Sequence, residues 1–264
     1  MQKMLPSPPP TCMGIDLGTT FSCIAVFEEG DVTVINSPSG RSITPSVIFA
    51  PNTDTAAIVG EGARTAAAKA AGMLVYDAKR FVGKRYAFEA VGREARGLPF
   101  EVAAGAGTEQ RQMEPHLQLA VGGQPVRLAP EGVGTLVVHE LKKAAGAHTG
   151  RMVDAAVLAV PVGFDWQQIN ATKQAAASAG VNVLRTIHEP TAAAMAYGLH
   201  TRAHVNTVMV YDIGGGTLDV SLLNLNNGVF EVARGKPGAM GAGLTAFSCV
   251  FLLCVRAGDG RVGR

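Results

Sequence analysis

The sequence predicts an α/β fold organised around a parallel sheet, with two similar lobes that face a shared ligand. The first observation is an alternation of apolar strands and helices over residues 155–199, because strands joined by helices pair in parallel. The second is a repeated device: a strand, an Asp-Gly turn and a return strand occur at residues 12–27 and again at 207–225. A device used twice indicates two lobes on either side of one ligand.

The composition is that of a globular protein with a sizeable core. The chain has 264 residues, which at about 150 residues per domain predicts two domains or lobes. Its residues are 47% hydrophobic and 17% charged, which excludes a wholly disordered chain. The net charge of +2 gives no basic excess that would indicate nucleic-acid binding. The four cysteines are too few and too scattered for a disulfide framework or a paired zinc site.

Targeting signals are not recognisable in the sequence. No apolar run reaches the roughly 18 residues that a membrane span requires. The first eleven residues contain several prolines but no apolar segment of the kind found in signal peptides. As the chain is written, these features predict a cytoplasmic protein without a membrane span.

The elements before residue 130 are predicted from short patterns and turn residues. Gly72 and Gly83 mark the ends of two helices, and Gly122-Gly123 marks a hairpin turn. The expected elements are a disordered lead-in (1–11), a strand broken by an Asp-Gly turn (12–27), strand and loop (32–49), an alanine-rich helix (63–71), a short helix (77–82) and an insertion built from hairpins (86–128).

The elements after residue 130 form the strand–helix alternation. Asp165 and Gln168 have the spacing of a capping box, so a helix is expected to begin there, and Gly180 marks its end. Pro190 fits the first position of a later helix. The expected order is an amphipathic helix (132–147), a buried strand (155–160), the capped helix, a strand (181–187) and a helix that ends near residue 199.

The two Asp-Gly turns have the chemistry of a phosphate site. Glycine lets a ligand approach the backbone, and consecutive amides form a concavity that binds anions. Asp16 and Asp212 precede the turns and would repel phosphate unless a cation such as Mg²⁺ lay between them. The turns are therefore predicted to hold one magnesium nucleotide from both sides. An ordinary hairpin turn remains the alternative for each, less so for the second, which contains three consecutive glycines.

Four motifs occur in the order and at the approximate spacing seen in one known family. They are Gly14–Thr20, Asp77–Gly83, Glu189–Ala194 and Asp212–Ser221. Over residues 13–245 the chain resembles the 70-kDa heat-shock (Hsp70, DnaK-like) chaperone family. Residues 195–200 and 222–224 are most similar to a microsomal, ATPase-core branch of that family.

The resemblance implies an actin-like ATPase fold, a duplicated ribonuclease H-like architecture with two lobes around a nucleotide cleft that takes ATP and Mg²⁺. The implied catalytic residues are Lys79, Glu189, Asp212 and Thr217. The implied phosphate-binding residues are Gly18, Thr19, Thr20, Gly214, Gly215, Gly216 and Thr217. The implied metal-binding residues, acting through water, are Asp16, Asp212 and Asp219, and Pro161 is the implied coupling residue that signals the nucleotide state.

The resemblance also implies partners and a role. The role is ATP-dependent protein folding, and the partners are ATP or ADP together with J-domain co-chaperones and nucleotide-exchange factors. An endoplasmic-reticulum location is the alternative to the cytoplasm and follows from the resemblance alone. A partner-binding or regulatory fragment without turnover is the second functional hypothesis. A sugar or acetate kinase of the same fold fits less well, because the Glu189–Ala194 motif is chaperone-like. The absence of a P-loop motif argues separately against a P-loop enzyme.

Some implied residues have ordinary structural interpretations. Lys79 and Arg80, with Lys84 and Arg85, are also what a solvated helical face contains. Glu189 before Pro190 is also what an ordinary helix start contains, since acids are favoured there.

Several positions depart from the family pattern. Phe21 stands where Tyr is usual, and His188 replaces an Asn. Ile169 and Trp166 replace polar or charged residues on the surface through which the family signals between domains. Interdomain signalling is therefore in doubt even if hydrolysis survives.

The predicted domain organisation is uneven. Residues 12–202 are expected to form lobe I without its closing helix, 203–246 part of lobe II, and 247–264 a divergent tail. The peptide-binding domain is expected to be absent, with either a truncated product or a genuine short form as the reason. Residues 208–210 are then expected to lie exposed, and the apolar run with Cys249 and Cys254 is expected to be core or disordered rather than a metal site.

Overall fold

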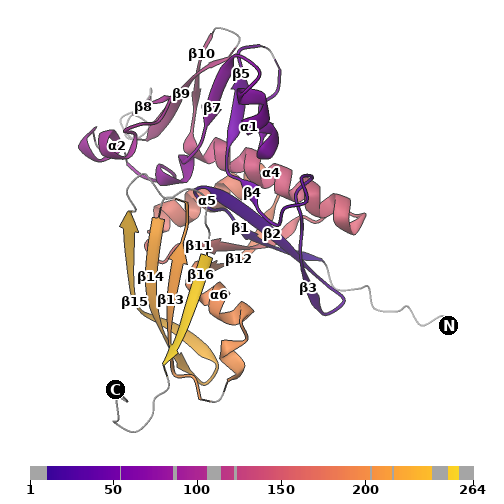
Figure 1. Ribbon diagram of the computed structural model, residues 1–264, viewed down its shortest axis with the longest axis vertical. Coiled ribbons are helices and arrows are strands. Elements are labelled where there is room, and N and C mark those ends of the chain that lie inside the picture. The colour runs from indigo at the N-terminus through magenta and orange to yellow at the C-terminus, as the bar shows by residue number, and fades with distance from the viewer. Residues whose placement is uncertain are drawn as a thin grey trace, which may run out of the picture.

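The structure is a computed structural model that describes residues 11–53, 55–85, 88–105, 114–121, 124–202, 204–215, 217–239 and 249–255. Most of the predicted lead-in, the Gly122-Gly123 turn and residues 256–264 lie outside the described residues. The chain forms a mixed α/β structure with a central layer, two small sheets at one end and a four-stranded sheet at the other (Figure 1).

The central layer is a six-stranded sheet with the order β12-β11-β1-β2-β3, in which β4 also pairs with β2. Strands β1, β11 and β12 pair in parallel, while β2 and β3 continue the sheet as antiparallel neighbours. The parallel pairing confirms the prediction from the strand–helix alternation. The strands are β1 (Cys12–Asp16), β2 (Phe21–Glu28), β3 (Asp31–Val34), β4 (Thr44–Pro45), β11 (Ala155–Val160) and β12 (Asn182–His188).

Two helices, α4 (Pro130–Thr149) and α5 (Trp166–Ser178), pack side by side on the central sheet. Ile15 and Leu158 from the sheet and Val137 from α4 belong to one buried cluster, which forms the main core. Helix α5 begins with the predicted capping box. The Asp165 side chain accepts a hydrogen bond from the backbone N–H of Gln168 at 2.9 Å, and the Gln168 side chain accepts one from the Asp165 N–H at 3.2 Å.

The upper end of the molecule contains two three-stranded sheets with the orders β6-β5-β7 and β10-β9-β8 (Figure 1). Their strands are β5 (Ile48–Pro51), β6 (Ile58–Val59), β7 (Gly72–Val75), β8 (Glu101–Ala104), β9 (Pro115–Val121) and β10 (Gln124–Leu128). Helix α1 (Glu61–Ala67) is shorter than predicted, and Gly72 opens β7 instead of ending a helix.

The insertion is not built from hairpins alone, because it also contains helix α2 (Phe88–Glu94). Val91 is buried in the upper core, and Ala95, four residues later, packs against the same core. This spacing of four places both side chains on one helix face. Packing against the upper core therefore outweighs the low helix propensity of Gly92.

The lower end is an antiparallel sheet with the order β15-β14-β13-β16. Its strands are β13 (Thr207–Ile213), β14 (Thr217–Asn226), β15 (Val229–Ala239) and β16 (Cys249–Val255). The prediction that residues 208–210 lie exposed is wrong, since Val208 and Val210 are 0% and 1% exposed. They are covered because β16 pairs with β13 and because α6 (Glu189–Ala196) and the short helix η2 (Leu199–Thr201) contribute Ala194 and Leu199 to the same cluster.

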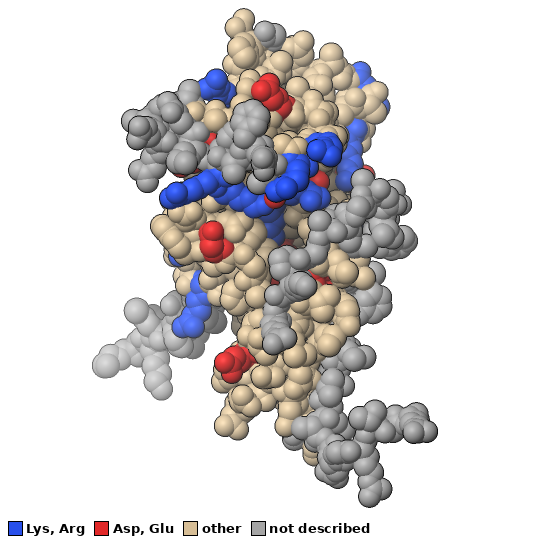
Figure 2. All heavy atoms as spheres, turned by 90° about the vertical axis from the view of Figure 1, so that its left-hand side faces the viewer, with Lys and Arg blue, Asp and Glu red and all other residues tan. Residues whose placement is uncertain are grey.

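The surface charges are unevenly distributed. On the face shown in Figure 2, Lys and Arg side chains gather in a band near the upper end, and the region below is mostly uncharged. Within the described part of the chain, no helix is both long enough and apolar enough to cross a membrane.

The capping box of α5 gives a stability test. Replacing Asp165 with Ala removes the acceptor for the Gln168 N–H, so we expect the free energy of unfolding to fall by about 1 kcal/mol. Urea denaturation measures the loss. Asp31→Ala, a change of an exposed acid on β3, is the control and should leave the free energy of unfolding nearly unchanged. Equal effects of the two substitutions would contradict a specific role for the cap.

Candidate functional site

A cavity of about 410 Å³ lies where the central sheet, the upper end and the lower sheet meet. The turn after β1 contributes Gly18, Thr19 and Thr20, and the turn after β13 contributes Gly214 and Gly215. The repeated Asp-Gly device therefore does what its duplication predicts: both turns line one cavity. Gly216, the third glycine of the second turn, lies outside the described residues.

The two turns approach each other so closely that only glycine fits between them. A Cβ atom on Gly215 would lie 2.6 Å from the Oγ1 atom of Thr20, and one on Gly18 would collide with the backbone oxygen of Phe21. The second turn is closed by a hydrogen bond of 2.9 Å from the Gly214 N–H to the backbone oxygen of Thr217. A side chain at Gly215 would push the two turns apart, and one at Gly18 would distort the first turn itself.

A buried ion pair crosses the cavity. Lys79 belongs to the short helix η1 (Ala78–Arg80), and Glu189 is the first residue of α6. The Lys79 Nζ atom donates a hydrogen bond to Glu189 Oε1 at 2.9 Å, with side chains only 11% and 14% exposed. The ammonium also lies 5.5 Å from the ring centroid of Phe164, which adds a cation–π contact. The alternative that Lys79 belongs to a solvated helical face is therefore wrong.

The cavity concentrates negative charge, with Asp16 exposed to the open cavity and Asp212 and Asp219 half-buried. Burial, followed by the charges of Glu189 and Asp212, raises the pKa of Asp16 to about 7, although Lys79 acts in the opposite direction. Burial and the charges of Glu189 and Asp219 raise the pKa of Asp212 to about 6. The pKa of Asp219 is also raised, first by burial and then by Glu189. The acids disfavour one another's ionisation, so the site lacks positive charge.

Lys79 supplies part of that charge and stays protonated. Burial by itself would lower the pKa of its ammonium, but the charges of Glu189, Asp16 and Asp212 outweigh burial and raise the pKa. A lysine in this setting is a fixed point charge, unlike a lysine whose pKa falls enough for it to act as a base.

A divalent cation fits the remaining imbalance. Mg²⁺ binds one or two carboxylates together with substrate phosphates and keeps several of its waters. Asp16, Asp212 and Asp219 all line the cavity, and after burial it is repulsion from neighbouring acids that raises their pKa values, which a bound cation would offset. Among the described residues, no group of three or more His, Cys, Asp or Glu is arranged to hold a metal ion directly.

The structure brings every described residue of the predicted site into this one cavity. Besides the two turns, the lining includes Lys79, Pro161, Glu189, Asp212, Thr217 and Asp219. Their individual roles remain predictions.

Sequence reasoning missed several lining residues. Among them, Lys84 forms an ion pair with Glu94 at 2.7 Å on the cavity wall. Phe164, which follows Pro161 by three residues, makes the cation–π contact with Lys79. Most of them lie close to predicted residues along the chain, but Glu94 is 15 residues from Lys79 and has no such signal. The missed residues are Arg80, Lys84, Glu94, Gly163, Phe164 and Gln168.

The departures from the family pattern have clear structural settings. The Phe21 ring lies 5.5 Å from the guanidinium of Arg64, so it makes a cation–π contact where a tyrosine would place a hydroxyl. His188 is the N-cap residue of α6, and its buried Nδ1 atom has no hydrogen-bond partner in the structure. Ile169 packs against the main core, whereas Trp166 is 72% exposed.

Comparison with known proteins agrees with this geometry. Residues 12–239 match the family described as Hsp70 protein. The chain is also 44% identical over 225 residues to the heat shock 70 kDa protein BIP3 of Oryza sativa subsp. japonica, an alignment that covers 84% of this chain and 32% of that protein. The chain thus spans about a third of the length of this relative. The family model matches most of the chain, and the two glycine turns share one cavity with the Lys79–Glu189 ion pair. This chain therefore belongs to the Hsp70 family and corresponds to part of its ATP-binding region.

Proposed function

We propose that this chain binds and hydrolyses ATP as the nucleotide-binding domain of a chaperone of the 70-kDa heat-shock type. The observation that carries the proposal is the Lys79–Glu189 ion pair between two glycine turns in one cavity. Phosphoryl transfer needs little covalent help from a protein and depends on positioning and on charge stabilisation. The cavity offers both, since it combines close-packed backbone turns with a buried, oriented ammonium.

Each part of the proposed site has a defined task. The amides of Gly214 and Gly215 and the hydroxyls of Thr19 and Thr20 bind the phosphate oxygens. Lys79, held by Glu189, places its ammonium beside the attacking water and the terminal phosphate as negative charge develops there. The Thr217 hydroxyl contacts the same water, and Glu189 orders the neighbouring waters.

Magnesium completes the charge balance in this proposal. Asp16, Asp212 and Asp219 would hold the ion through its waters, where it would supply positive charge next to the phosphates. Pro161 follows β11 and lines the cavity, which supports the proposal that it responds to the nucleotide state.

The wider role is also a proposal. Family membership supports ATP-dependent protein folding with J-domain co-chaperones and nucleotide-exchange factors as partners. An endoplasmic-reticulum location rests on the resemblance of residues 195–200 to the microsomal branch. The division into lobe I (12–202), partial lobe II (203–246) and tail (247–264) likewise stays a prediction.

The charge imbalance predicts an unusual pH dependence for the metal-free protein. Because the pKa of Asp16 is raised from 3.8 to about 7, the folded chain binds more protons than the unfolded chain between these pH values. The contribution of Asp16 to the free energy of unfolding therefore falls as the pH rises. Asp16→Asn should match the unchanged protein near the lower value and exceed it above pH 7. The excess should be on the order of 2 kcal/mol, about half of what the full shift would give, because Asp16 is exposed and solvent screens its charge.

Urea denaturation in EDTA at several pH values measures this difference. Asp31→Asn, an exposed change on β3, should give a constant difference across the same range. A gap between Asp16→Asn and the unchanged protein that does not vary with pH would contradict the charge argument.

Lys79 gives the decisive test of turnover. Lys79→Ala should lower steady-state ATP hydrolysis at least about a hundredfold while ATP binding changes much less, because the ammonium acts mainly as charge develops. Lys143→Ala, a change of an exposed lysine on α4, should hydrolyse ATP normally. If the unchanged protein binds ATP without hydrolysing it, the chain is a non-catalytic regulatory or partner-binding module instead.

Asp212 tests the shared metal. If Asp212 holds Mg²⁺ through water, Asp212→Asn should weaken binding of magnesium-ATP about tenfold and leave binding of ATP in EDTA nearly unchanged or slightly stronger. Titration calorimetry with and without Mg²⁺ measures both affinities. Equal losses in the two conditions would leave the turn as an anion site without a metal.

A further inference from the structure

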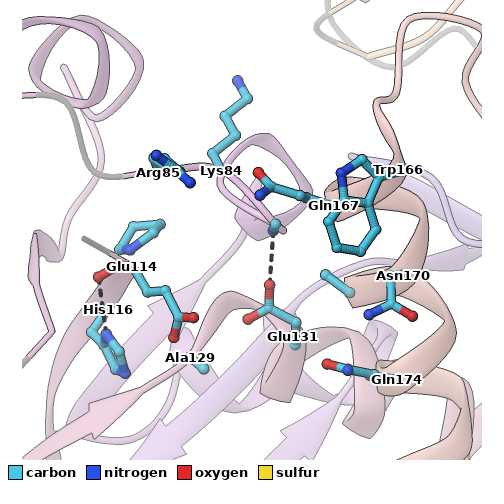
Figure 3. Close-up of a pocket in the computed structure, with 13 residues that line it drawn as sticks. Lys84, Arg85, Glu114, His116, Ala129, Glu131, Trp166, Gln167, Asn170 and Gln174 are labelled. Atoms are coloured by element: carbon cyan, nitrogen blue, oxygen red, sulfur yellow. Dashed lines mark hydrogen bonds between the residues drawn. The ribbon is translucent and has the colours of Figure 1, made fainter. Parts of the chain in front are cut away.

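A second cavity lies on the other side of the segment that carries Lys79. Its volume is about 820 Å³. The cavity lined by the two glycine turns, which we call the nucleotide cavity after its proposed function, has a volume of about 410 Å³. Figure 3 shows its walls: the segment after η1, the start of β9, the start of α4 and one face of α5. Apart from Lys84, these lining residues do not belong to the nucleotide cavity. We call this second cavity the outer groove.

One wall of the outer groove carries three unpaired carboxamides. Gln167, Asn170 and Gln174 are three and four residues apart on α5, so they share one helix face, and all three line the groove (Figure 3). None of them forms a hydrogen bond with any described residue. A carboxamide both donates and accepts, as the backbone of an extended peptide does. Three such groups in a row suit a peptide backbone laid along the helix.

The groove also presents unpaired charges of both signs. Glu131 uses its Oε1 atom to accept a hydrogen bond of 2.8 Å from the Gly83 N–H, which leaves Oε2 available. Glu114 and Arg85 form no ion pair with any described residue. Lys84 differs, because Glu94 neutralises it at 2.7 Å. Two carboxylates and one guanidinium of the groove therefore have no ion-pair partner within the described part of the chain.

An exposed aromatic ring completes the wall. Trp166 is the first residue of α5 and is 72% exposed, although burial of an indole is strongly favourable. Such a ring attracts a cation across its face and gains more when a ligand covers its apolar surface. Its position beside the carboxamide row lets one ligand contact both (Figure 3).

We propose that the outer groove binds an extended peptide segment that carries one basic and one acidic side chain. The basic side chain lies between Trp166 and the carboxylates of Glu114 and Glu131, and the acidic one pairs with Arg85. The carboxamides of α5 bind the backbone between them. This proposal rests on the groove alone and is independent of ATP hydrolysis.

The chain provides its own reporter, because Trp166 is its only tryptophan. The probe is a short capped peptide of glycine, serine and alanine with one arginine and one glutamate, titrated into the full-length chain. We expect the emission of Trp166 to shift, with binding weakened about tenfold when glutamine replaces either the arginine or the glutamate of the probe.

Matched substitutions assign each charge. Glu114→Gln should abolish the preference for arginine in the probe and keep the preference for glutamate, and Arg85→Gln should do the reverse. Glu101→Gln on β8 and Arg127→Gln on β10 are exposed controls and should keep both preferences. Glu131 is not substituted, since it also holds Gly83, four residues after Lys79. Trp166→Ala removes the fluorescent reporter, so its binding is measured by calorimetry and should be weaker. Tyr197→Ala, a change of another exposed aromatic residue, is the control and should bind the probe normally.

The outcomes separate the proposal from its competitors. Absence of any emission change with the probe up to about 1 mM would overturn it. A shift with maltotriose and none with the peptides would identify a carbohydrate site instead. Equal binding of all three peptides would show that the charges play no part, and this result would also overturn the proposal.

Discussion

The ion pair between Lys79 and Glu189 is the interaction on which the rest of the site depends. It joins η1, at the base of the upper end, to the start of α6, which packs on the lower sheet. A charged pair taken out of water is stable only when its geometry is good and its neighbours compensate it. Here Phe164 covers the ammonium while Asp16 and Asp212 add negative charge nearby. The arrangement satisfies the lysine and leaves the carboxylates short of positive charge, which is the condition that the proposed magnesium nucleotide would relieve.

For the proposed function, the backbone around this pair has to come close enough for phosphates to contact amides from both turns. Gly215 packs against Thr20 with no room for a Cβ atom, so the contact between the turns is made by backbone and a single hydroxyl side chain. The parallel strands β1 and β11 set the position of the first turn, and the β13–β14 hairpin sets the second. Regular pairing on both sides fixes the turns before any ligand binds. The site is therefore largely preorganised, which is where most electrostatic catalysis originates.

The parts of the fold that follow from local rules could be predicted from the sequence. The capping box at Asp165, the buried strand at residues 155–160 and the meeting of the two glycine turns all depend on short patterns or on duplication. Burial of Lys79 could not be predicted locally, because its partner lies 110 residues away in the chain. The covering of Val208 by β16 and α6 depends in the same way on distant segments. Local propensity also failed for α2, where tertiary packing of Val91 decides the structure.

The segment that carries Lys79 is also the wall between the nucleotide cavity and the outer groove. Ala78, Phe81 and Val82 are buried in or beside the upper core, so the segment has little freedom to move on its own. Its groove side is tied to α4 by the hydrogen bond from Gly83 to Glu131, and its other side presents the ammonium to Glu189. A ligand that binds the available Oε2 atom of Glu131 shares this carboxylate with Gly83, which is bound to Oε1. Any resulting change in the position of Lys79 must act in both directions, since coupling between two binding sites is reciprocal.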